Sequence, residues 1–111
     1  MKKKNVIKKY REFKEILNLR KFKRNSLFTI YYRDSEIKKT RVGILITKKH
    51  GNAVKRNLIK RQIRNIIDHT LDYKDSKDLI IVISKQYNPN EFKRNEEMLQ
   101  KLLQSIIKEV N

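Results

Sequence analysis

Apolar residues recur at helical spacing in three segments of the chain. The first segment, residues 8–18, predicts a short amphipathic helix with apolar positions at Tyr10, Phe13, Ile16 and Leu17. A longer helix is expected from Ala53 to about Leu71. The final helix is expected to begin near Glu91, and its apolar positions are Leu99, Leu102, Leu103, Ile106, Ile107 and Val110.

Other segments are rich in β-branched and aromatic residues and predict strands. They read SLFTIYYR over residues 26–33, RVGILIT over 41–47 and LIIVIS over 79–84, with a short edge strand expected at 21–24. Segment 41–47 is apolar on both faces, which favours a central position in the sheet. Alternation along segment 26–33 places Leu27, Thr29 and Tyr31 on one face and Phe28, Ile30 and Tyr32 on the other.

The predicted order of elements is α-β-β-β-α-β-α, or α-β-β-α-β-α without the short strand at 21–24. Either order is typical of an α+β domain. A chain of 111 residues has room for one core, so we expect a single domain over residues 1–111. Segments 41–47 and 79–84, with a helix between them, predict two parallel strands joined by a crossover. The general rule for such crossovers is a right-handed connection.

Positive charge is concentrated in one part of the chain. There are 29 basic and 12 acidic residues, which gives a net charge of +17. Residues 41–64 contain eight basic residues and no acidic one, whereas residues 65–111 contain seven basic and eight acidic ones. This surplus favours a polyanionic partner, with RNA, DNA and an anionic membrane as candidates, and its uneven distribution favours nucleic acid.

Several protein classes are excluded by what the sequence lacks. The absence of cysteine excludes a disulfide scaffold, a cysteine-based zinc site and a cysteine nucleophile. No apolar run approaches the ~18 residues of a membrane span, and no apolar stretch of a secretory signal follows the basic residues 1–4. We therefore expect a cytoplasmic protein without a membrane partner.

The helix expected from Ala53 carries its charge on one side. On a helical wheel the polar side covers an arc of roughly 140°, made of Arg56, Asn57, Lys60, Arg61 and Arg64. The adjoining side is apolar and contains Ile59, Ile63, Ile66 and Ile67, and Leu58 falls outside both arcs. A merely solvated face usually mixes charges of both signs, because like charges four residues apart repel. The unbroken basic series therefore favours contacts with phosphate.

The turn before this helix, residues 48–52, adds to the basic surface. Lys48 and Lys49 supply charge, and His50 is a candidate for a further phosphate contact. Gly51 can adopt an unusual backbone conformation, and Asn52 is a good N-cap. The free N–H groups of a helix N-terminus are themselves a natural phosphate site.

Residues Thr47 to Arg61, together with Arg64 and the Arg41-Val42-Gly43 segment, resemble the bacterial ribonuclease P protein subunit. The family pattern is K-K-x-G-x-A-V-x-R-N-R-x-K-R, and the spacing here is uninterrupted. Leu58 is the one departure, since it stands where the family usually has the second Arg of R-N-R. The resemblance extends from Phe13 to the final helix.

The resemblance implies a fold, a reaction and partners. The fold is an α+β sandwich similar to the second domain of ribosomal protein S5, with a left-handed β-α-β crossover. The partners are ribonuclease P RNA and precursor tRNA, whose 5′ leader is removed by endonucleolytic hydrolysis. The RNA and the substrate hold the catalytic Mg²⁺, so no catalytic or metal-binding residue is expected in the protein. The RNA-binding residues are Lys48, Lys49, Asn52, Arg56, Asn57, Lys60, Arg61 and Arg64.

Phe13 and Tyr31 match the family's aromatic positions lining a cleft for the single-stranded leader, and Leu17 replaces an often bulkier residue nearby. Unpaired bases stack on aromatic rings with little sequence preference. The alternative for Phe13 and Tyr31 is that both rings belong to the core. Phe28, Tyr32 and Phe92 are assigned to the core or its rim.

Two other functional classes share parts of this pattern. A structural RNA-binding protein, such as a small ribosomal protein, has the same size and charge. A nuclease that acts without RNA needs clustered acids for two Mg²⁺ ions. The acids Asp68, Asp72, Asp75 and Asp78 are interpreted instead as a solvated helix end and loop, and His69 as a surface residue. The isolated protein is expected to be a monomer.

Overall fold

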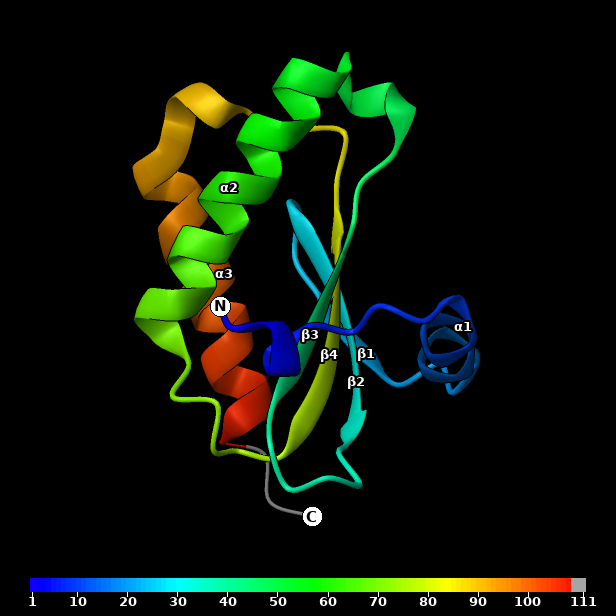
Figure 1. Ribbon diagram of the computed structural model, residues 1–111. Coiled ribbons are helices and arrows are strands. Elements are labelled where there is room, and N and C mark those ends of the chain that lie inside the picture. The colour runs from blue at the N-terminus through cyan, green and yellow to red at the C-terminus, as the bar shows by residue number, and fades with distance from the viewer. Residues whose placement is uncertain (109–111) are drawn as a thin grey trace.

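Figure 1 shows a sheet with helices on both faces, in a computed structural model that describes residues 1–108. The helices are α1 (Tyr10–Asn18), α2 (Ala53–Thr70) and α3 (Phe92–Ile107). The strands are β1 (Phe22–Arg24), β2 (Phe28–Asp34), β3 (Arg41–Leu45) and β4 (Lys77–Ile83), and short 3₁₀ turns cover Lys3–Asn5, Lys48–His50 and Pro89–Glu91. The predicted order α-β-β-β-α-β-α is confirmed. Val110, predicted in the last helix, lies outside the described residues.

The strand order in the sheet is β1-β2-β4-β3. Neighbouring strands are antiparallel except for β3 and β4, which are parallel as predicted. The expectation that segment 41–47 is central is wrong, because within residues 1–108 β3 has a neighbouring strand, β4, on one side only. Its outer side is covered by the N-terminal segment, where the Ile7 N–H donates to the Val42 carbonyl oxygen at 3.0 Å. β3 is apolar on both faces because helices cover both faces of the sheet.

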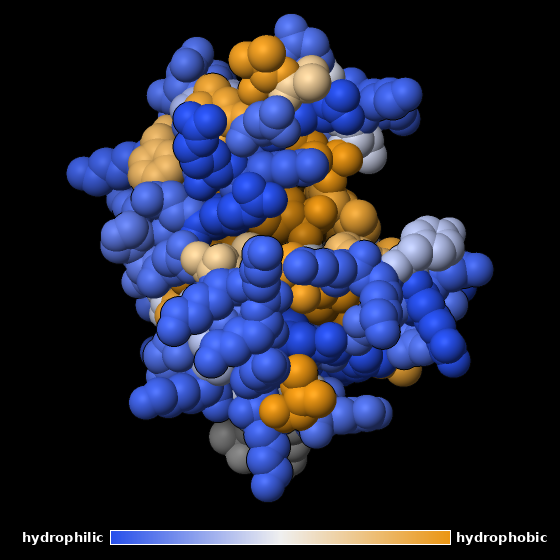
Figure 2. Space-filling view, in the orientation of Figure 1, coloured by the Kyte–Doolittle hydropathy of each residue, from blue (hydrophilic) through white to orange (hydrophobic). Residues whose placement is uncertain are grey.

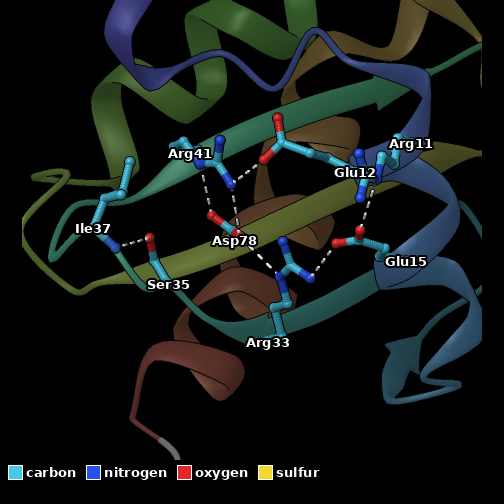
Figure 3. Close-up of polar contacts among 8 residues, drawn as sticks. All are labelled: Arg11, Glu12, Glu15, Arg33, Ser35, Ile37, Arg41 and Asp78. Atoms are coloured by element: carbon cyan, nitrogen blue, oxygen red, sulfur yellow. Dashed lines mark hydrogen bonds and ion pairs between the residues drawn. The ribbon is translucent and has the colours of Figure 1, made fainter.

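The crossover from β3 through α2 to β4 is left-handed. When the sheet is viewed from the face covered by α2, with β3 and β4 pointing up, β4 lies to the left of β3 (Figures 1 and 3). The general right-handed rule therefore fails here, and the handedness implied by the family resemblance is confirmed.

The main core lies between the sheet and the layer formed by α2 and α3. Phe28, Ile30 and Tyr32 of β2 are buried in it, as alternation predicted, and Phe92 packs against its rim. The facing of Leu27 was predicted wrongly, since Leu27 is buried in this same core. It precedes β2 in a turn where the Asn25 side-chain oxygen accepts the N–H groups of residues 27 and 28, so strand alternation does not reach it.

A second, smaller core lies on the opposite face of the sheet, under α1 (Figure 1). Its buried members are Ile7, Ile16 and Ile80. The partly buried residues around them are Phe13, Leu17, Tyr31, Leu45 and Val82. Within residues 1–108, none of the helices has the length and apolar character that crossing a membrane requires.

Candidate nucleic-acid interface

The basic series on α2 is built on a well-defined helix start. Gly51 has φ +117°, a conformation that favours glycine, and the Asn52 side-chain oxygen caps the helix by accepting the Lys55 N–H at 2.9 Å. This N-cap was predicted. The side-chain amide N–H groups of Asn52 are donors that it can offer to RNA.

The apolar and basic sides of α2 lie where the helical wheel predicted them. The four isoleucines at positions 59, 63, 66 and 67 are buried. Asn57, Arg61 and Arg64 are exposed, while Arg56 and Lys60 are half-buried at the boundary with the core. Leu58 is 40% exposed, in agreement with its predicted position off the core side. The cationic groups thus form one continuous surface on this helix.

A recess beside β3 connects the basic surface with the predicted aromatic cleft. It has a volume of about 160 Å³, and its lining includes Phe13 of α1, Gly43 of β3, and Lys60 and Arg64 of α2. Figure 2 shows a hollow with an apolar floor between the hydrophilic surfaces of α2 and α1. Phe13, predicted for the leader cleft, therefore borders the same recess as Lys60 and Arg64 of the basic series, whereas Leu17 and Tyr31 do not line it.

The three residues predicted for the leader cleft all lie around the small core on the sheet face under α1. Phe13, Leu17 and Tyr31 are each half-buried against the small core, so part of each side chain packs and part faces solvent. The Tyr31 ring lies 5.2 Å from the ring of Phe22, its cross-strand neighbour on β1. Sequence reasoning did not single out Phe22, although the short strand 21–24 placed it on the sheet edge.

The prediction that His50 contacts phosphate through its ring is wrong. The side chain is 7% exposed, and its Nε2 atom donates to the carbonyl oxygen of Ile83 at 2.9 Å. The ring therefore fastens the turn to the end of β4. Lys48 and Lys49 of the same turn are exposed, so the two lysines remain the basic groups of this turn that are open to a ligand.

The interpretation of Asp78 as a solvated carboxylate is also wrong. Asp78 is 1% exposed and lies between Arg33 and Arg41 on the neighbouring strands (Figure 3). Hydrogen bonds to Asp78 and to Glu12 raise the pKa of Arg41 against the opposing effect of burial. Burial alone lowers the pKa of Arg33, but bonds to Asp78 and Glu15 outweigh it and raise that pKa. Strand alternation could have placed Arg33 on the face of Tyr31, but nothing local indicated its partner.

The other three acids, Asp68, Asp72 and Asp75, are exposed at the helix end and in the following loop, as predicted. Asp68 accepts from the N-terminal ammonium at 2.8 Å and from the Tyr73 hydroxyl at 2.6 Å. His69 is exposed at the helix end, as predicted. Across residues 1–108, no group of three or more His, Cys, Asp or Glu side chains is arranged to hold a metal ion.

A basic helix next to an aromatic, apolar hollow on a small α+β domain is the combination found in proteins that bind nucleic acid. The family model described as "Ribonuclease P" matches residues 1–107 of the chain. The chain therefore belongs to the ribonuclease P protein family.

Individual relatives cover almost the whole chain. The ribonuclease P protein component of Mycoplasma capricolum is 44% identical over 112 residues, which cover 99% of each protein. That of Mesoplasma florum is 42% identical over 110 residues, which cover 97% of this chain and all of the relative. The solved structure of the Staphylococcus aureus RNase P protein superposes with a TM-score of 0.75 at 30% identity, covering 96% of this chain and 98% of that one.

Proposed function

We propose that this chain is the protein subunit of an RNA-based ribonuclease P and assists removal of the 5′ leader from precursor tRNA. The basic surface of α2 and the lysines of the preceding turn bind ribonuclease P RNA. The hollow between α2 and α1 holds the leader. The observation that supports this proposal most strongly is the recess that is lined by Phe13 together with Lys60 and Arg64.

The chemistry of the hollow suits an extended single strand. Aromatic faces stack on unpaired bases of any identity, and nearby cations attract the phosphates between them. Such a site binds the backbone and the base faces with little sequence preference. This suits a leader whose sequence differs from one precursor tRNA to the next. Asn57, exposed beside the basic groups, can donate to and accept from a base edge or a ribose hydroxyl.

The hydrolytic step belongs to the RNA in this proposal. The RNA and the substrate hold the Mg²⁺ ions that activate water, and the described protein residues bind and orient the leader. A monomeric subunit in the cytoplasm, where precursor tRNA is processed, is the form we propose. A structural RNA-binding protein shares the charge of the chain, but the family match separates it from this assignment.

The test measures the affinity of the reconstituted holoenzyme for precursor tRNAs with leaders of one or of several nucleotides. Tyr31→Ala should weaken binding of the long-leader substrate by ~1–3 kcal/mol, the contribution of one stacked base, and should hardly change the short-leader substrate. Tyr31→Phe is the matched control, because it keeps the ring and should bind like the unmodified protein. Equal losses for both substrates would contradict leader contact at Tyr31.

A further inference from the structure

Two parallel rows of side chains cross the sheet on the face covered by α1. In one row Tyr31, Ile80 and Gly43 are register neighbours on β2, β4 and β3. In the adjoining row, two residues away along each strand, the neighbours are Arg33, Asp78 and Arg41. The first row forms the floor beneath Phe13, and the second is made entirely of charged groups.

The charged row is linked to α1 by direct contacts (Figure 3). Arg41 binds both oxygens of Asp78, each at 3.0 Å, and its Nη2 atom also contacts Glu12 of α1 at 2.6 Å. Arg33 binds Asp78 at 3.0 Å and Glu15 of α1 at 3.3 Å. Asp78 thus orients two arginines, and each arginine holds one glutamate of the helix.

These contacts add direction to the apolar packing of α1. Ile16 is the one fully buried residue of this nine-residue helix, and Phe13 and Leu17 are partly buried against the small core. Apolar packing is non-directional, whereas ion pairs at Glu12 and Glu15 fix one side of the helix against the sheet. Forked arginine contacts are well suited to this, since they define orientation as well as distance.

The position of Phe13 depends on how α1 is rolled. Phe13 directly follows Glu12, and its ring lies over Gly43, where an added Cβ would come within 2.5 Å of the Phe13 Cζ atom. The ring therefore fills the space that a side chain at residue 43 would occupy. A rotation of α1 about its axis would lift the ring out of that space and change the wall of the recess.

The charge balance of the row also separates it from the RNA-binding surface. Arg33 and Arg41 direct their donors at Asp78, Glu12 and Glu15, so their charges are neutralised within the protein. Carboxylates this close to a proposed leader site repel phosphate. Glutamates at positions 12 and 15 therefore act against RNA affinity unless they have another role there.

We propose that Arg41, oriented by Asp78, is a positioning residue: it holds Glu12 and so sets α1 with Phe13 facing the leader. The proposal rests on the proposed function, because it assumes that the hollow receives the leader. Arg41 itself does not touch RNA, and Glu12 raises the affinity for long leaders in spite of its negative charge.

Whether Glu12→Gln strengthens or weakens binding of the leader tests the positioning role directly. The matched control is Glu97→Gln on α3, an exposed site where the same negative charge is removed. Charge alone predicts that both variants bind RNA slightly more tightly. Positioning predicts instead that Glu12→Gln reduces the affinity ratio of long-leader to short-leader precursor tRNA by about three- to tenfold in the holoenzyme. The control should leave that ratio unchanged.

Two further variants complete the test. Arg41→Lys keeps the charge but cannot bridge two carboxylates as a guanidinium does, so it should lower the ratio to a similar extent. In a Phe13→Ala background, Glu12→Gln should have no additional effect, because the residue it positions is absent.

The outcomes separate the two proposals. An unchanged or increased ratio in Glu12→Gln and Arg41→Lys, with Phe13→Ala lowering it, would overturn the positioning role alone. No effect of Phe13→Ala on the ratio would overturn the leader site in this hollow, and the positioning role with it. Equal losses from Glu12→Gln with and without Phe13 would show that Glu12 acts by another route, which also refutes the proposal.

Discussion

The basic surface of α2 makes a quantitative prediction about salt. Replacing Arg56, Lys60, Arg61 and Arg64 together by alanine removes the four cations of the α2 series. If each neutralises one phosphate, the slope of log affinity against log salt should flatten by about 0.7–0.9 per residue, or roughly three units in all. Between 50 and 200 mM salt, the unmodified protein should then lose roughly 50- to 150-fold more affinity than the variant.

The assay is a salt titration of binding to the cognate ribonuclease P RNA, followed by anisotropy of labelled RNA. A control variant loses four positive charges from α3 and its C-cap instead. It replaces by alanine the exposed residues Lys93, Arg94, Lys101 and Lys108. Its slope should stay close to that of the unmodified protein. An unchanged slope in the α2 variant, or equal flattening in both, would refute local phosphate contacts by α2.

Three further substitutions test the stability of the fold. Leu102→Ala should destabilise the domain by ~2–5 kcal/mol in urea unfolding, because it leaves a cavity in the main core, while the folded fraction keeps its RNA affinity; a parallel loss of affinity would place α3 in the interface. Asn52→Ala removes the acceptor of the Lys55 N–H and should cost ~0.5–2 kcal/mol; no change would argue against the cap. Burial raises the pKa of Asp68, but bonds from the N-terminal ammonium and Tyr73 lower it overall, so its stabilisation is present above the ordinary carboxylate pKa of ~4 and is lost as the pH falls through the lowered value. Asp68→Asn should therefore be less stable at neutral pH and equal to the unmodified protein in strong acid, and a difference that persists in acid would contradict this.

Local patterns were sufficient to predict the elements of the fold but not the neighbours of each strand. Apolar periodicity identified the three α-helices, and β-branched and aromatic content identified β2, β3 and β4. The apolar residues on both faces of β3 suggested a central strand, but helices on both faces of the sheet bury an edge strand in the same way. The crossover hand came from the family resemblance and ran against the general rule.

The same distinction, between what a local pattern determines and what the fold supplies, applies to the residues of the candidate site. The helical wheel separated Lys60 and Arg64 from the core side, because the basic face and the apolar face belong to the same helix and follow from its local sequence. His50 and Asp78 were misjudged, because their partners lie 33 and 37 or more residues away in the chain. A titratable residue in a basic turn or beside a buried strand looks available to a ligand until the fold supplies a partner from elsewhere.

The central claim is that this protein assists an RNA catalyst, and cleavage of precursor tRNA at low Mg²⁺ tests it most directly. Purified protein, cognate ribonuclease P RNA and their mixture are each incubated with substrate, and release of the 5′ leader is measured. We predict no cleavage by the protein alone and strong stimulation when the protein is added to the RNA. Cleavage by the protein alone, or no stimulation of the RNA, would contradict the account.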